Sequence, residues 1–149
     1  MTAEPDPLEA VGARVGHAFG DRTLLRQALT HRSYRNEHLA ERDNEALAFL
    51  GDAVLTLVVT EWLWQTSPVE PVGVLTPRRA ALVSGATLAG WAAGLGLGRH
   101  LRLGRGEEQS GGAAKESVLA TALEAVLAVV YLESGLPAVR RVVASLAVW

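Results

Sequence analysis

Three acidic residues, Glu45, Asp52 and Glu124, stand at spacings that could build a reactive site. Each belongs to an apolar stretch with helical periodicity, and an α-helix turns by about 100° per residue. Positions 45, 48 and 52 therefore fall within about 60° of one another on one helix face. Burying an unpaired carboxylate is costly, which favours a functional interpretation of Asp52 and Glu124 over a structural one.

Positions 121 and 124 lie one turn apart on a later helix. If the two helix faces meet, carboxylates at these positions would surround a small oxygen-lined cavity. Such a cavity suits Mg²⁺, which prefers carboxylate and water ligands. A metal ion held there can activate water and neutralise charge on a phosphate, and phosphodiester hydrolysis needs such an arrangement.

The elements that must position these residues are helices. Apolar periodicity predicts a first helix that starts at the N-cap Asp6 and runs to Phe19, and a second helix that starts after Asp21 and runs to Thr30. A polar segment, residues 32–43, follows them. The next predicted helix has Asn44 as its N-cap, is long and largely buried, and ends near residues 65–68.

Beyond a proline-rich loop through Gly73, helices are predicted from Pro77 and Thr87. The glycine-rich residues 94–112 favour turns and a loop. Another apolar helix begins after Lys115 and closes at residues 134–135, and a last helix runs toward the chain end. No convincing strand pattern occurs, so we expect an all-α bundle forming one domain over residues 1–149.

Composition narrows the class of protein. The chain has 149 residues, 49% of them hydrophobic, which is enough for a core, and it has no cysteine to form disulfides or thiolate metal sites. Neither a signal sequence nor an uninterrupted apolar run of about 18 residues is apparent. We therefore expect a cytoplasmic protein that is not associated with a membrane. The net charge of −2 disfavours bulk electrostatic binding to nucleic acid.

Residues 44–55, which read NEALAFLGDAVL, resemble the ribonuclease III helix that usually reads NERLEFLGDAVL. Further matches follow the family's order at residues 31–38, 79–83, 104–112 and 115–120. The resemblance therefore covers nearly the whole chain. It implies an all-α endonuclease fold, a symmetric homodimer, double-stranded or structured RNA as substrate, and Mg²⁺ or Mn²⁺ as cofactor.

The family's four metal-binding acids correspond here to Ala48, Asp52, Thr121 and Glu124. A further family acid aligns with Val72, and Glu70 lies nearby in the same loop. The resemblance leaves Asp52 and Glu124 as metal ligands and, with Glu45, as the catalytic candidates. Stabilisation of the helix dipole is an equally good explanation of Glu45. Two carboxylates with water could still hold one Mg²⁺ weakly, whereas a two-metal site is disfavoured.

Two functions remain open from the sequence. The first is a metal-dependent endoribonuclease of weakened activity, and the second is an inactive homodimer that binds structured RNA, a ribonucleoprotein or a protein partner as a scaffold. His31 is expected to cap or pack and not to catalyse. No double-stranded-RNA-binding domain is expected within the chain. The candidate RNA-binding residues are Arg32, Ser33, Arg78, Arg79, Arg105 and Lys115.

Overall fold

The computed structural model describes residues 6–149 and is helical throughout. The helices in chain order are α1 (Pro7–Val15), α2 (Arg22–Ala28), α3 (Arg32–Glu37), α4 (Glu45–Thr66), α5 (Val72–Leu82), α6 (Gly85–Gly94), η1 (Leu97–His100), α7 (Arg105–Gln109), η2 (Gly112–Ala114) and α8 (Glu116–Ala147). Among the described residues, strand-like pairing is limited to one parallel bridge between Thr30 and Arg102. The predicted all-α fold is confirmed.

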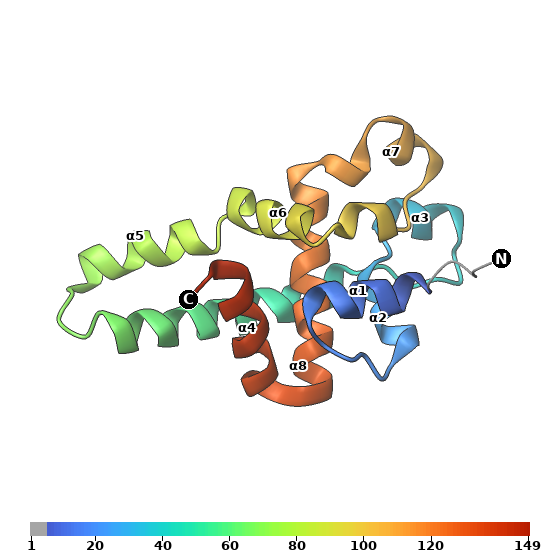
Figure 1. Cartoon of the computed structure of the whole chain (residues 1–149). Coiled ribbons are helices and arrows are strands. Elements are labelled where there is room, and N and C mark those ends of the chain that lie inside the picture. The colour runs from blue at the N-terminus through green and yellow to red at the C-terminus, as the bar shows by residue number, and fades with distance from the viewer. Residues whose placement is uncertain (1–5) are drawn as a thin grey trace.

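Helix α8 runs through the centre of the molecule (Figure 1). It packs most extensively against α4 and next against α6. Its first half is almost wholly apolar, and its inward residues from Val118 to Val130 are buried. At Gly135 the backbone leaves helical geometry, with φ 73° and ψ −173°, and the chain turns back before Pro137. The helix break predicted at residues 134–135 is confirmed.

Helices α1 and α2 begin where the sequence predicted. The Asp6 carboxylate accepts the Leu8 backbone N–H at 3.0 Å, and the Asp21 carboxylate accepts that of Leu24 at 2.9 Å. The predicted extension of the first helix to Phe19 is wrong, because Gly16 takes a left-handed conformation with φ 81° and ends α1. Phe19 instead packs against the core from the connecting loop.

Short helices lie in two segments predicted as irregular. Helix α3 occupies part of the polar segment and has no buried residue, so hydrophobic periodicity could not reveal it. The glycine-rich residues 94–112 contain η1, α7 and the start of η2, each of five residues or fewer.

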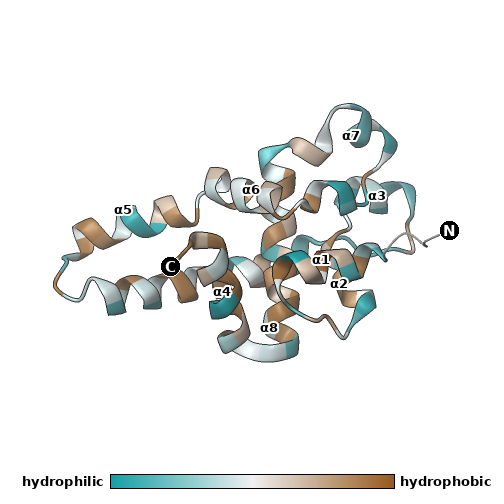
Figure 2. Cartoon of the chain, in the orientation of Figure 1, coloured by the Kyte–Doolittle hydropathy of each residue, from teal (hydrophilic) through white to brown (hydrophobic). Residues whose placement is uncertain are grey.

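The second half of α4 and the antiparallel α5 project from the body as an arm, residues 57–82 (Figure 1). Helix α5 begins at Val72 and contains Pro77 in its interior, so the predicted start at Pro77 is wrong. None of its residues is buried. Both helices of the arm carry hydrophobic residues, drawn in brown in Figure 2. The large hydrophobic side chains of the arm that are exposed to solvent are Leu57, Trp64, Val69, Val72 and Val74.

Helices α4 and α8 are each long and apolar enough to cross a membrane by length and composition alone. In this fold they pack against each other, and their buried residues form the greater part of the core. Their hydrophobicity is therefore accounted for by burial within the bundle, as in the core helices of many globular proteins.

Candidate active site

The site lies where α4 crosses α8, at Gly51. A Cβ atom built on Gly51 would stand 1.7 Å from the carbonyl oxygen of Glu124, which is far inside van der Waals contact. Only glycine permits the two backbones to approach so closely. This contact fixes the register of the two helices and brings the neighbouring residue of Gly51, Asp52, to the level of Glu124.

Asp52 and Glu124 interact electrostatically. Burial raises the pKa of the Glu124 carboxyl to about 7, with the negative charge of Asp52 as the second cause. Near neutral pH, Glu124 is therefore protonated in about half of the molecules. The structure thus brings together the two acids that the sequence nominated as metal ligands, and it places Glu124 where its negative charge is costly.

The other two positions of the expected acid set contribute no carboxylate. Ala48 is buried, with 6% of its surface exposed, on the same helix as Asp52. The Thr121 hydroxyl donates to the backbone carbonyl of Ser117 at 2.8 Å, within its own helix. Both side chains are therefore used in packing or in local hydrogen bonding.

Glu45 lies two turns before Asp52 on α4 and forms an ion pair with Arg32, the Nη1–Oε1 distance being 3.6 Å. Both side chains are largely exposed, so this pair contributes little to stability. Glu45 and Thr121 line one cavity of about 220 Å³, whose other lining residues are His31, Arg32, Asn44, Ser117 and Val118. Glu45 thus belongs to a polar pocket one turn of α8 away from Glu124.

His31 caps α3, as expected for a non-catalytic residue. Its Nδ1 accepts the Ser33 backbone N–H at 3.2 Å and lies 2.8 Å from the Ser33 hydroxyl oxygen. The pKa of His31 is lowered, mainly by burial. Its side chain is therefore committed to holding α3 beside the polar pocket.

Asn44 does not cap α4 with its side chain, contrary to the prediction. Its amide instead donates to the Ala28 carbonyl at 3.1 Å, which ties the start of α4 to the end of α2. The Asp43 carboxylate accepts the Glu45 backbone N–H at 3.1 Å. Asparagine is a favoured N-cap residue, but the buried Asn44 side chain makes this tertiary hydrogen bond instead of capping α4.

The donor set fits one divalent cation of the Mg²⁺ kind. Mg²⁺ in proteins is commonly held by one or two carboxylates and completes its shell with water and substrate oxygens. Asp52 and Glu124 supply two carboxylates, and no group of three or more potential ligands among His, Cys, Asp and Glu occurs in residues 6–149. The set does not fit a two-metal site, which needs more bridging carboxylates.

The candidate RNA-binding residues fall into two groups. Arg32, Ser33, Arg105 and Lys115 lie on or beside α3 and α7, which pack against each other. The other two, Arg78 and Arg79, lie on α5 in the arm, at a distance from α3 and α7 (Figure 1).

Several of these groups already have partners within the chain. The Ser33 hydroxyl accepts the Gly104 backbone N–H at 2.8 Å, and Lys115 forms an ion pair of 3.0 Å with Glu107. Arg78 donates to the Ser67 hydroxyl at 2.9 Å. Ser33 therefore has a structural role, and the positive charge of Lys115 is locally compensated.

Gly51, whose backbone contact sets the helix crossing, was not among the positions predicted from the sequence. A glycine in the interior of an apolar helix is unfavourable unless another backbone approaches it, and this signal was available in residues 47–55. Ser117 was also missed. It lines the polar pocket and accepts the Thr121 hydroxyl through its carbonyl.

Comparisons with known proteins give similarities over most of the chain. The model of the Ribonuclease-III-like family matches residues 21–148. A Ribonuclease 3 of Geobacter metallireducens is 52% identical over 134 residues, covering 88% of this chain and 54% of the relative. A Ribonuclease 3 of Syntrophobacter fumaroxidans is 48% identical over 143 residues, covering 95% and 59% respectively. The chain thus spans a little over half the length of these curated relatives.

The nuclease domain of ribonuclease III from Campylobacter jejuni has been solved more than once. One such structure, whose description concerns flexibility in a region involved in dimer formation, matches with a TM-score of 0.88 and 37% identity, covering 93% of this chain and 94% of that one. Another matches with a TM-score of 0.86 and 38% identity, covering 93% and 91%. The fold similarity therefore extends over nearly the whole chain.

Proposed function

Because this chain belongs to the ribonuclease III family and is similar to solved nuclease domains of ribonuclease III, we propose that it acts on double-stranded or structured RNA as a divalent-metal-dependent phosphodiester hydrolase of reduced activity. One observation carries the catalytic part of the proposal. The backbone contact between Gly51 and Glu124 keeps Asp52 beside Glu124, which preserves two carboxylates at the helix crossing.

Asp52 and Glu124 would hold the cation, preferably Mg²⁺ or Mn²⁺. When bound, the cation supplies an activated water and neutralises charge on the phosphate. Glu124 must lose its proton to serve as a ligand, and burial beside Asp52 opposes that loss. Cation binding should therefore weaken as the pH falls below about 7, because the proton competes with the cation for Glu124. Glu45 would support the site by supplying a carboxylate to the adjoining pocket, beside Arg32.

The proposal includes a homodimer. Phe49 follows Ala48 on α4. It has 84% of its surface exposed, although phenylalanine is usually buried. The arm adds further exposed apolar residues, including Trp64 with 73% of its surface exposed. Apolar side chains gathered on one helix pair mark a protein interface, and a second copy would bury them symmetrically.

Affinity for RNA should be modest and should fall steeply with salt. The net charge is −2, and several surface cations are paired: Arg32 with Glu45, Arg35 with Asp43, Arg102 with Glu41 and Lys115 with Glu107. Phosphates must compete with these carboxylates. Recognition would rest on the phosphate backbone and the helical shape of the RNA, which suits double-stranded RNA. We also propose a cytoplasmic location.

A second candidate function is a scaffold that binds structured RNA or a ribonucleoprotein without cutting. The observation that favours it is the loss of two acids, since Ala48 is buried and apolar and Thr121 is hydrogen-bonded within α8. A site with two ligands, one of them half protonated, should place a cation less firmly than the full acid set would.

Cleavage of end-labelled double-stranded RNA by the purified protein, with Mg²⁺ or Mn²⁺, decides between the two functions. The matched control is the double variant Asp52→Asn, Glu124→Gln. Slow cleavage that disappears in this variant supports the hydrolase. No cleavage at high protein concentration, together with retained RNA binding in a filter assay, overturns the hydrolase and supports the scaffold.

A further inference from the structure

A basic cavity lies on the α1–α2 side of the molecule and shares no lining residue with the polar pocket at Glu45. Its volume is about 300 Å³, at the lower end of the range for small-molecule sites. The lining residues are Asp6, Pro7, Leu8, Arg22, Arg26, Leu29, Arg99, His100, Leu101 and Arg102. Four arginines thus surround one carboxylate, on a protein whose net charge is negative.

Two of the four arginines have carboxylate partners. Arg22 forms an ion pair with Asp6. Arg102 donates to both oxygens of Glu41, at 3.2 and 3.3 Å, and lies over the ring of Tyr34. These pairs fix two sides of the cavity, because they join α1 to α2 and the segment after η1 to the loop before α4.

The other two arginines, Arg26 and Arg99, form no direct ion pair in residues 6–149, although Arg26 lies close enough to Asp6 and Glu41 to help lower the pKa of both carboxyls. They come from separate elements, α2 and η1, and line the same cavity. Both side chains are exposed, and the four arginines of the lining outnumber the carboxylates of Asp6 and Glu41 by two. This excess of positive charge favours an anionic ligand.

His100 lines the same cavity and lies near Arg99. Its pKa is lowered by burial and, secondarily, by the charge of Arg99. At neutral pH the imidazole is therefore uncharged and can still donate one hydrogen bond to an oxyanion.

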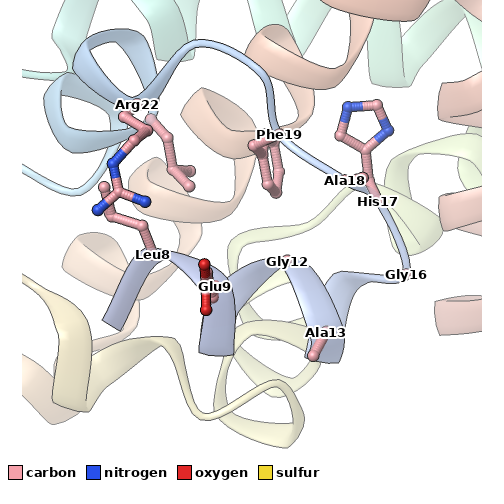
Figure 3. A pocket seen from close by; sticks show the side chains of 10 residues that line it. Leu8, Glu9, Gly12, Ala13, Gly16, His17, Ala18, Phe19 and Arg22 are labelled. Atoms are coloured by element: carbon pink, nitrogen blue, oxygen red, sulfur yellow. The ribbon is translucent and has the colours of Figure 1, made fainter. Parts of the chain in front are cut away.

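An apolar cavity of about 460 Å³ adjoins the basic one and shares Leu8 and Arg22 with it. In Figure 3, the Phe19 ring faces α1 across this cavity, and Arg22 extends from α2 toward Leu8. His17 points away from α1 in the same view. A ligand with an anionic group on the arginines would thus have room for an apolar or aromatic part beside Phe19.

We propose that the basic cavity binds the diphosphate group of a small ligand, either inorganic pyrophosphate or a nucleoside diphosphate. The guanidinium group offers a planar set of donors that matches phosphate oxygens in pairs, and two unpaired guanidinium groups suit two phosphates. A multiply charged anion is required, because it must outweigh the repulsion of Asp6. This binding is independent of the nuclease activity proposed above.

Isothermal titration of the full chain with pyrophosphate, in EDTA and at near-physiological salt, tests the proposal. The expected dissociation constant is about 1 mM or lower, weakened by about tenfold or more in the double variant Arg26→Ala, Arg99→Ala. The control is Arg78→Ala, Arg141→Ala, which removes the same charge at residues outside the cavity. Thermal unfolding of each variant verifies that it is folded.

A parallel titration with a nucleoside diphosphate distinguishes the two sources of the diphosphate. Tighter binding than pyrophosphate indicates a nucleotide whose nucleoside occupies the cavity beside Phe19, and equal binding indicates that the diphosphate group alone is recognised. Absence of binding by both ligands overturns the proposal. So does an equal loss of affinity in the two double variants, because binding would then reflect overall charge.

Discussion

Gly51 of α4 and Glu124 of α8 are in backbone contact at the centre of the fold, with no room for a side chain at position 51. The residues are 73 positions apart in sequence, yet this contact sets the distance between the two helices that carry the remaining acids. The geometry of the site therefore depends on a glycine that has no chemical group of its own.

Replacement of Gly51 by alanine should destabilise the protein by roughly 2–4 kcal/mol, because the added methyl group meets a carbonyl oxygen and the helices must separate. Urea denaturation measures this change. Gly90→Ala is the matched control, since Gly90 lies within α6 and its Cβ would meet nothing within 4 Å. That control should be neutral or slightly stabilising. Equal effects of the two substitutions would contradict the tight crossing.

The contribution of Glu124 to stability should increase as the pH falls from 8 to 5 in the metal-free protein, whereas the lowered pKa values of His31 and His100 act in the opposite direction. The pKa of Glu124 is about 7 in the folded state against an ordinary value of 4.5, so the folded protein takes up a proton over this range before the unfolded chain does. The gain should be about 1 kcal/mol, which allows for solvent screening of a half-buried group.

Urea denaturation in EDTA at several pH values measures this effect of pH. Glu124→Gln should lack the Glu124 contribution, so that its stability advantage over the unsubstituted chain is largest at pH 8 and shrinks toward pH 5, since an amide avoids the cost of a buried charge. Glu108→Gln, at an exposed position, should leave the dependence unchanged. A Glu124→Gln variant with the original pH dependence would refute the role assigned to this carboxyl.

Replacement of Phe49 by alanine should weaken self-association by tenfold or more, about 1.4 kcal/mol or more, without destabilising the subunit. The ring is 84% exposed in the single chain, so its contribution would come from burial against a second copy. Sedimentation velocity over a concentration series measures the dimer. Leu132→Ala, at a position on α8 that is 52% exposed, is the control and should remain dimeric. An unchanged dimer in the Phe49 variant would exclude this side chain from the interface.

Restoration of the two missing acids, with Ala48→Glu and Thr121→Asp, should raise cleavage of double-stranded RNA by at least about 100-fold in Mn²⁺, because the cation and its water would be held more firmly. Without metal the variant should lose roughly 1–2 kcal/mol of stability, since position 48 is buried. Gel analysis and thermal unfolding measure the two effects. The double variant Ala46→Glu, Ala93→Glu, at exposed positions on α4 and α6, controls for the two added charges. No gain in cleavage would show that the catalytic geometry has changed beyond the two substitutions.

The long apolar helices were predictable because their apolar residues recur every three to four positions over many turns. Helix α4 and the first half of α8 were found in this way, and Gly135 with Pro137 marked the break in α8. The exposed helices were not predictable. Helices α3 and α5 bury none of their residues, so α3 was missed and α5 was started five residues late, at Pro77.

The sequence alone determined which acids remain and which helix face each shares, because side chains on one helix are placed by their spacing. Glu45 and Asp52 on α4, and Thr121 and Glu124 on α8, are examples. Tertiary structure alone decided the separation of the two helices, the burial that raises the pKa of Glu124, and the convergence of arginines from α2 and η1. These properties arise from contacts between residues far apart in the chain, which no local pattern specifies.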